Sequence, residues 1–168
     1  MPDNPTIDQD YLLANLQMLL NIPSPTGYHE RAIAWLIEQI EALGIEGLQT
    51  EVTNKGALLA TLAGQASLGK RALSGHIDTL GAMVREVKTN GRLLLTQLGG
   101  YAWNAIENEN VSVYSVRQGT TTRGTVQTVS PSVHTSDEAR DGKRVEDRME
   151  VRLDARTSSA AETRALGI

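Results

Sequence analysis

The chain has 168 residues, a net charge of −4 at pH 7 and no cysteine. Hydrophobic residues make up 40% and charged residues 21%, a balance typical of a globular protein rather than a disordered one. Basic residues are scattered, which argues against a nucleic acid as partner. Without cysteine, disulfides and thiolate metal sites are excluded.

The first ten residues are polar and acidic, and they lack the basic and apolar regions of a signal peptide. The apolar runs of the sequence are too short to cross a bilayer, so no membrane partner is expected. These features together predict a cytoplasmic protein.

Two helices are predicted in the first 44 residues. Helical spacing of apolar residues marks the first, which Asp8 or Asp10 can cap. The prolines of Ile22-Pro23-Ser24-Pro25-Thr26-Gly27 end it. Thr26 is the expected cap of the second helix, with Glu30 in its first turn and Gly44 as its stop.

Strands are predicted from residue 48 onward. Segments 48–53 and 57–62 flank the turn Asn54-Lys55-Gly56. Segment 71–75 is predicted as a third strand that leads into His76-Ile77-Asp78. Helices followed by strands indicate an α/β layer.

After Gly81 the pattern is almost entirely that of short strands. They are predicted at 83–87, 92–97, 111–116, 124–129 and 149–153. Their regular spacing predicts a small antiparallel barrel or sandwich. A short helix, capped by Ser158 or Ser159 and ended by Gly167, is predicted last.

The chemistry-bearing residues reduce to His76 and its neighbours. The sequence has three histidines, and it contains no His-Glu-x-x-His helix, no Gly-x-Ser-x-Gly elbow and no Walker loop. Strand alternation would place His76 and Asp78 on one face at the carboxyl end of a strand, where ligands bind in α/β sheets. A metal-bound histidine usually has such an acceptor beside it. The alternative is a histidine that merely hydrogen-bonds a nearby aspartate.

The other candidates favour structural interpretations. His29 is expected in a surface or capping turn, and His134 in an exposed loop where it could also meet a ligand or a partner subunit. The charged stretch from Asp137 to Glu150 is interpreted as a solvated loop and strand edge. Tyr101 and Trp103 could lie at an interface or in the core of a small domain.

Several segments, taken in order, resemble the glutamyl- and tetrahedral-aminopeptidase family of dinuclear metallopeptidases, some members of which were once labelled endoglucanases. The main ones are Ile22-Pro23-Ser24-Pro25-Thr26-Gly27-Tyr28, Asn54-Lys55-Gly56 and Ser74-Gly75-His76-Ile77-Asp78-Thr79-Leu80-Gly81. Leu98-Gly99-Gly100 and Pro131-Ser132-Val133-His134 extend the likeness over essentially the whole chain.

The resemblance implies a zinc-peptidase-type α/β layer into which a small β-barrel-like domain is inserted. Residues 1–81 would form the N-terminal part of the catalytic domain, 82–157 the β-rich dimerisation domain, and 158–168 a return helix. It also implies a site with two divalent metals, zinc or cobalt, a peptide substrate, and homo-oligomers assembled through the β-rich domain. His76 would be the first metal ligand and Asp78 the catalytic partner that orients the site.

The family's bridging aspartate, catalytic glutamate, other carboxylate ligands and last histidine follow the inserted domain, and this sequence ends before them. We therefore expect the chain alone to be inactive, with apolar helix faces exposed. One hypothesis is an aminopeptidase fragment, and the other is a non-catalytic dimerisation module that joins full-length subunits. Polysaccharide hydrolysis is a weaker idea, because it needs two positioned carboxylates.

Overall fold

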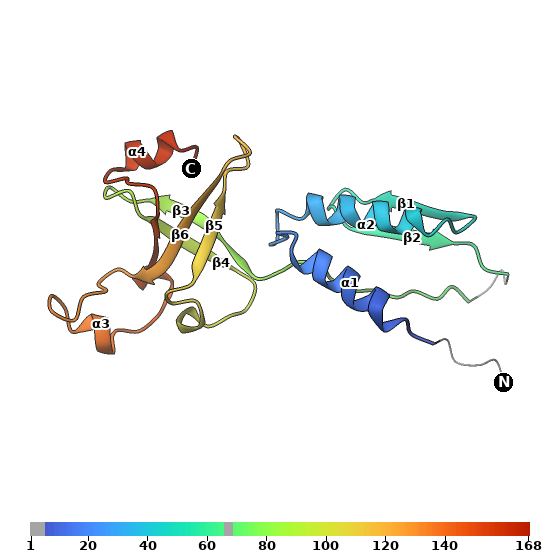
Figure 1. Ribbon diagram of the computed structural model, residues 1–168, viewed down its shortest axis with the longest axis horizontal. Helices are drawn as coiled ribbons and strands as arrows, with labels where there is room; N and C mark the ends of the chain where they lie inside the picture. Colours follow the sequence, from blue (N-terminus) through green and yellow to red (C-terminus); the bar gives the residue numbers. More distant parts are fainter. Residues whose placement is uncertain (1–5, 66–68) are drawn as a thin grey trace. The chain divides into compact units, whose positions relative to one another are not determined.

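The computed structural model describes residues 6–65 and 69–168, so the first half of the acidic stretch at residues 1–10 lies outside the described residues. The chain divides into two compact units, Met1–Thr79 and Leu80–Ile168. The first unit contains α1 (Gln9–Leu20), α2 (Glu30–Ala42), β1 (Leu48–Val52) and β2 (Leu58–Leu62) (Figure 1). The second contains β3 (Gly81–Val87), β4 (Leu93–Leu98), η1 (Trp103–Ala105), β5 (Asn110–Tyr114), β6 (Thr121–Thr128), α3 (Glu138–Asp141), η2 (Glu146–Arg148), β7 (Met149–Leu153) and α4 (Ala160–Ala165).

Helix α1 begins where the sequence predicts. The Asp8 side chain accepts a hydrogen bond from the backbone N–H of Tyr11 at 3.0 Å, which satisfies one of the free donors of the first turn. Of the two predicted caps, Asp8 is therefore the one used. No described helix is long and apolar enough to cross a membrane.

The predicted cap of α2 is wrong. A turn closed by the hydrogen bond from Tyr28 N to Pro25 O separates Thr26 from the helix, and α2 begins at Glu30 with His29 in the capping position. The His29 side chain makes no capping hydrogen bond. The predicted stop is confirmed, since Gly44 follows α2 with φ +60, a left-handed conformation that glycine adopts without strain.

Strands β1 and β2 form an antiparallel hairpin in which Leu48 faces Leu62 and Val52 faces Leu58. The predicted strand at 71–75 is wrong, because residues 69–78 form no strand in the structure. A strand needs a hydrogen-bonded neighbour, and no described strand pairs with this segment.

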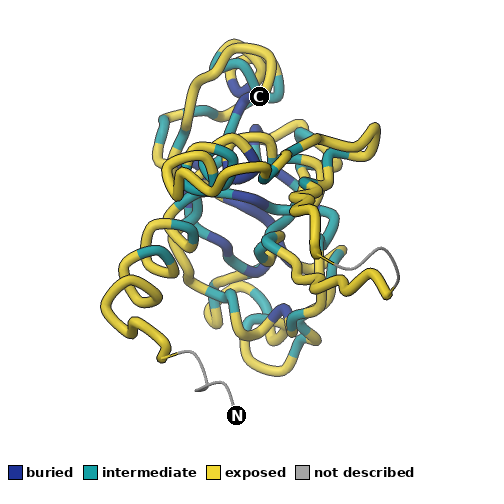
Figure 2. Tube along the Cα trace, turned by 90° about the vertical axis from the view of Figure 1, so that its right-hand side faces the viewer, coloured by how far each residue is buried: buried dark blue, intermediate teal, exposed yellow. Residues whose placement is uncertain are grey.

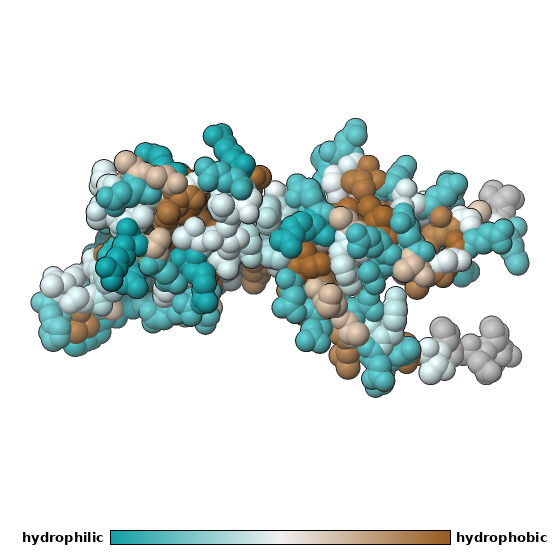
Figure 3. Space-filling view, turned by 45° about the horizontal axis from the view of Figure 1, so that its top comes forward, coloured by the Kyte–Doolittle hydropathy of each residue, from teal (hydrophilic) through white to brown (hydrophobic). Residues whose placement is uncertain are grey.

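The first unit leaves much of its apolar surface exposed, as the incomplete layer predicts. Helix α1 has no buried residue, and only Ser24, Ala32 and Ile33 are buried among the unit's described residues. The tube of α1, next to the N-terminus, is coloured as exposed along most of its length (Figure 2). Hydrophobic side chains also gather in patches on the surface (Figure 3). The fold of this unit therefore owes little to a core of its own.

The second unit is built on a five-stranded antiparallel sheet with the order β3-β4-β7-β6-β5. Alternate residues of the central strands point into one core, which consists of Leu93, Leu95, Trp103, Val126, Met149, Val151 and Leu153. Trp103 is 8% exposed and meets Tyr101 edge to face, with ring centroids 5.7 Å apart. Of the two alternatives for this tryptophan, the core is the one the structure adopts.

Helix α4 packs on this sheet. Ser159 caps the helix by accepting from Glu162 N at 3.3 Å, and the Glu162 carboxylate accepts from Ser158 N at 2.6 Å. The hydrogen bonds that Ser158 donates to the carboxylate, first from its backbone N–H and then from its hydroxyl, lower the pKa of Glu162. The buried Thr163 hydroxyl donates to Gly91 O at 2.8 Å, which ties the helix to the β3–β4 turn.

The interpretation of residues 137–150 as solvated is wrong for Glu150, which is completely buried. It lies on the face of β7 opposite Met149 and Val151, because side chains alternate along a strand. Its carboxylate binds Lys88 Nζ at 2.7 Å and the guanidinium of Arg92. Two cations from the β3–β4 hairpin therefore compensate the buried charge.

Replacing Glu150 with alanine should lower the free energy of unfolding by about 3 kcal/mol, because it leaves two partly buried cations without this partner. The matched control is Glu138→Ala, which breaks the more exposed pair with Arg148 and should cost under about 1 kcal/mol. Urea unfolding followed by circular dichroism measures both. Equal losses in the two variants would contradict the role given to Glu150.

Candidate metal-ligating site

His76 and Asp78 meet in the extended segment that precedes the second unit. The distance from His76 Nδ1 to Asp78 Oδ1 is 3.1 Å, so the carboxylate favours the tautomer with the proton on Nδ1. That tautomer leaves the lone pair of Nε2 available to a metal ion. The His76 side chain is 84% exposed and that of Asp78 is 50% exposed, so the ring is accessible.

Backbone hydrogen bonds hold the segment around Asp78. The completely buried Ser24 donates from Oγ to Ile77 O at 2.8 Å, and its own carbonyl accepts from Thr79 N at 3.1 Å. Pro25 and Thr79 form an isolated parallel β-bridge beside these bonds. The Pro-Ser-Pro segment, which the sequence marks as a helix breaker, thus lies against the segment that carries the site.

His29 lies against Gly56 and belongs to no group of metal-ligating side chains in the described part of the chain. A Cβ atom at position 56 would come within 2.3 Å of His29 Nε2, and Gly56 has φ +82. The half-buried ring therefore rests on the Asn54-Lys55-Gly56 turn. Its position fits the structural interpretation made from the sequence.

His134 is exposed and lies in a turn, as expected from the sequence. A cavity of about 210 Å³ opens in the second unit. It is lined by Thr128, Val129, Ser130, Glu138, Gly142, Lys143, Val145 and Arg148, so it includes no histidine. The carboxylate of Glu138 in its wall is already paired with Arg148. This cavity therefore offers no free ligand set.

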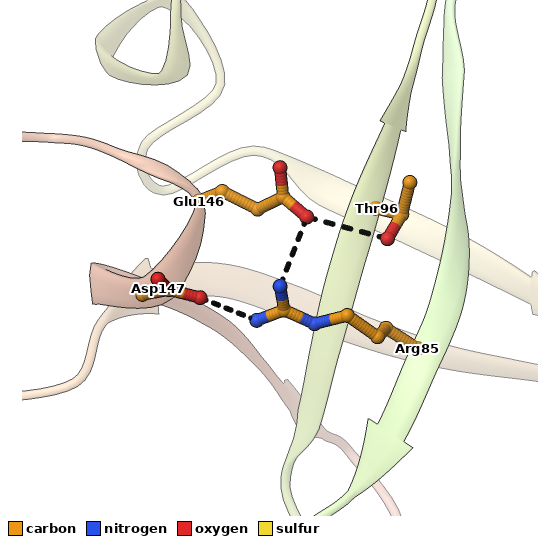
Figure 4. Close-up of polar contacts among 4 residues, drawn as sticks. All are labelled: Arg85, Thr96, Glu146 and Asp147. Atoms are coloured by element: carbon orange, nitrogen blue, oxygen red, sulfur yellow. Dashed lines mark hydrogen bonds and ion pairs between the residues drawn. The ribbon is translucent and has the colours of Figure 1, made fainter.

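The acidic residues of η2 are engaged by an arginine. Arg85 donates from its two terminal nitrogens to Glu146 at 3.1 Å and to Asp147 at 2.6 Å, while Thr96 donates to the same Glu146 oxygen at 3.2 Å (Figure 4). The hydrogen bond to Asp147 is the main reason that the pKa of Arg85 is raised. The positive charge of Arg85 beside Glu146 and Asp147 disfavours the binding of a metal cation by these two carboxylates.

A complete metal site is therefore not built by the described residues. No group of three or more histidine, cysteine, aspartate or glutamate side chains lies together in the described part of the chain. A catalytic zinc ion generally needs three protein ligands. His76 with Asp78 beside it would amount to one imidazole and one carboxylate, which is one corner of such a site and not the whole.

The fold agrees with comparisons to known proteins. The profile of the M42 glutamyl aminopeptidase family matches residues 56–168, about two thirds of the chain. The chain belongs to this family of aminopeptidases.

Individual relatives are similar over most of this chain. YhfE of Bacillus subtilis (strain 168), an aminopeptidase by name, is 35% identical over 153 residues, covering 91% of this chain and 43% of its own length. The aminopeptidase APDkam598 of the archaeon Desulfurococcus kamchatkensis has a similar fold, with a TM-score of 0.78, 17% identity and coverage of 95% of this chain and 41% of its own. The TET1 peptidase of Pyrococcus horikoshii, which can assemble into a tetrahedron or a large octahedral shell, has a TM-score of 0.67, 19% identity and coverage of 92% and 43%. The chain thus spans well under half the length of these relatives.

Sequence reasoning missed Ser24 as part of the site. Serine in a loop carries no signal by itself, and its partners Ile77 and Thr79 are more than fifty residues away. The only usable hint was the position of Ser24 between two prolines, which restrict its backbone to extended conformations.

Replacing Gly56 with alanine should displace His29, because the new methyl group would occupy the space of the ring. The matched control is Gly44→Ala, which has a similar positive φ but nothing within 4 Å of the added carbon. Both variants should lose about 1–2 kcal/mol of unfolding free energy to backbone strain. Only Gly56→Ala should also shift the ring signals of His29 in NMR spectra, and unshifted signals would contradict the contact.

Proposed function

We propose that this chain forms the N-terminal part of a metal-dependent aminopeptidase that removes N-terminal residues from peptides. The observation that carries the proposal is the exposed His76 ring, whose Nδ1 is bound by Asp78, in a chain of the M42 family. In this proposal His76 is a metal ligand and Asp78 is the catalytic partner that holds its ring.

The metal would be divalent zinc or cobalt, two ions in the complete site, as the family resemblance implies. Imidazole is a suitable ligand for both metals. The remaining ligands and the general base would come from polypeptide outside these 168 residues, which fits the greater length of the relatives. One ligand and one orienting carboxylate cannot hold a catalytic ion, so the chain alone is inactive in this proposal.

The second unit would provide assembly. We place the dimerisation domain at residues 82–157, with residues 158–168 leading the chain out of it and the catalytic part at residues 1–81. The well-formed core of this unit supports an autonomous role. The assemblies described for the Pyrococcus horikoshii TET1 peptidase support a homo-oligomer. We also propose a cytoplasmic location, with which the lack of cysteine is compatible.

The alternative is a non-catalytic dimerisation module that pairs with full-length subunits. The uneven packing of the two units supports this non-catalytic module. The second unit buries a core of seven hydrophobic residues, whereas the first exposes the apolar side chains of α1. A chain of this kind would dimerise through the sheet without supplying a working site.

The purified chain, assayed with aminoacyl-p-nitroanilides and added Zn²⁺ or Co²⁺, should hydrolyse them no faster than its His76→Ala variant. The physical reason is the missing ligand set. In parallel, Zn²⁺ should broaden or shift the His76 ring signals in NMR spectra of the wild-type chain, with His134 as the internal control.

Hydrolysis that disappears in His76→Ala would contradict the inactivity of the chain and support the metal role of His76. Absence of any His76 response to millimolar Zn²⁺ would contradict the metal role itself. A dimer by light scattering, together with that negative result, would favour the non-catalytic module.

A further inference from the structure

We infer that Ser24 is a positioning residue, whose two hydrogen bonds fix the backbone of Asp78 and thereby set the His76–Asp78 pair. The inference rests on the proposed function, because it gives Ser24 a role only through His76. Ser24 lies more than fifty residues before the pair, in the loop between α1 and α2.

Ser24 is hydrogen-bonded to both of the peptide planes that flank Asp78. Each peptide group is planar, so the conformation of a residue is set by the orientations of the planes before and after it. Ser24 Oγ holds the carbonyl of the first plane at Ile77, at 2.8 Å. The Ser24 carbonyl holds the N–H of the second plane at Thr79, at 3.1 Å. One residue therefore restrains both dihedral angles of Asp78.

The direction of the Asp78 side chain follows from these angles. The side chain is half exposed, and its Oδ1 lies 3.1 Å from His76 Nδ1. An exposed pair of this kind contributes little by itself and pays the entropy of ordering two side chains. Backbone restraint from Ser24 removes part of that entropy before the pair forms.

Ser24 itself is held by its surroundings. It is completely buried, so water does not compete for its hydroxyl. Pro23 and Pro25 have fixed φ angles, and Pro25 restricts Ser24 to extended conformations. The parallel bridge between Pro25 and Thr79 adds a further contact at the same place. The loop thus holds the Ser24 hydroxyl and carbonyl rigidly beside residues 77–79, which are not part of a sheet.

The test uses the full 168-residue chain without metal and measures two quantities by NMR. One is the hydrogen-exchange rate of the Thr79 amide. The other is the tautomer of His76, read from its ring ¹⁵N shifts at pH 8.5, where a free imidazole is neutral. Ser24→Ala removes the hydrogen bond from Oγ to Ile77 O and keeps the backbone bond to Thr79 N. The loss of that neighbouring bond should loosen the segment and speed Thr79 exchange by roughly tenfold. It should also lower the population with the proton on His76 Nδ1.

Ser115→Ala is the matched control. Its buried hydroxyl donates to Gly167 O at 2.5 Å in the other unit, so the same substitution removes a comparable bond. It should leave Thr79 exchange and the His76 tautomer unchanged. Ser24→Cys, nearly the same size and a weaker donor, should give intermediate values for both quantities.

An unchanged His76 tautomer in Ser24→Ala would overturn the inference, even if that variant were less stable. Should Ser24→Ala fail to fold, the same criterion applies to Ser24→Cys. Neither readout requires a metal ion. If the His76 signals of the wild-type chain do not respond to Zn²⁺, the proposed function is contradicted. The two metal-free measurements still decide the role of Ser24.

Discussion

Apolar burial in this chain is concentrated on one face of the five-stranded sheet. Strands β4, β6 and β7 lie at the centre of the sheet, and their inward residues make up most of the core. Since hydrophobic burial is the main favourable term in folding, the second unit has its own source of stability. The first unit buries only three of its described residues and lacks a comparable source.

This difference decides how each unit holds its functional groups. In the second unit, charges are fixed by packing: Glu150 lies buried between Lys88 and Arg92, and Arg85 engages the carboxylates of η2. In the first unit, the segment with His76 and Asp78 has no sheet around it and relies on hydrogen bonds from one buried serine. The candidate site is therefore the less well supported part of the chain, and its geometry depends on a few polar contacts.

The same difference bears on the metal chemistry of the family. A metal site is assembled from ligands on several elements, and rigid elements hold ligands more accurately than loops. In the function proposed here, this chain contributes one imidazole, with a carboxylate beside it. That proposal requires a further layer of polypeptide that covers the exposed face of α1 and brings the other ligands to His76.

Local features could be predicted from the sequence, because these features depend on residues close along the chain. A cap at Asp8 or Asp10, the stop at Gly44, the turn at Asn54-Lys55-Gly56 and the strands of the second unit all follow from spacing and turn chemistry, and the structure selects Asp8 as the cap. The pairing of His76 with Asp78 also follows from their separation of two residues, although not from a strand as predicted. The tertiary structure alone decided that residues 71–75 remain unpaired, that Glu150 is buried and that Ser24 binds both sides of Asp78. Each of these outcomes depends on which distant segment of the chain lies beside the residue. Such long-range contacts cannot be predicted from the spacing of residues close along the sequence.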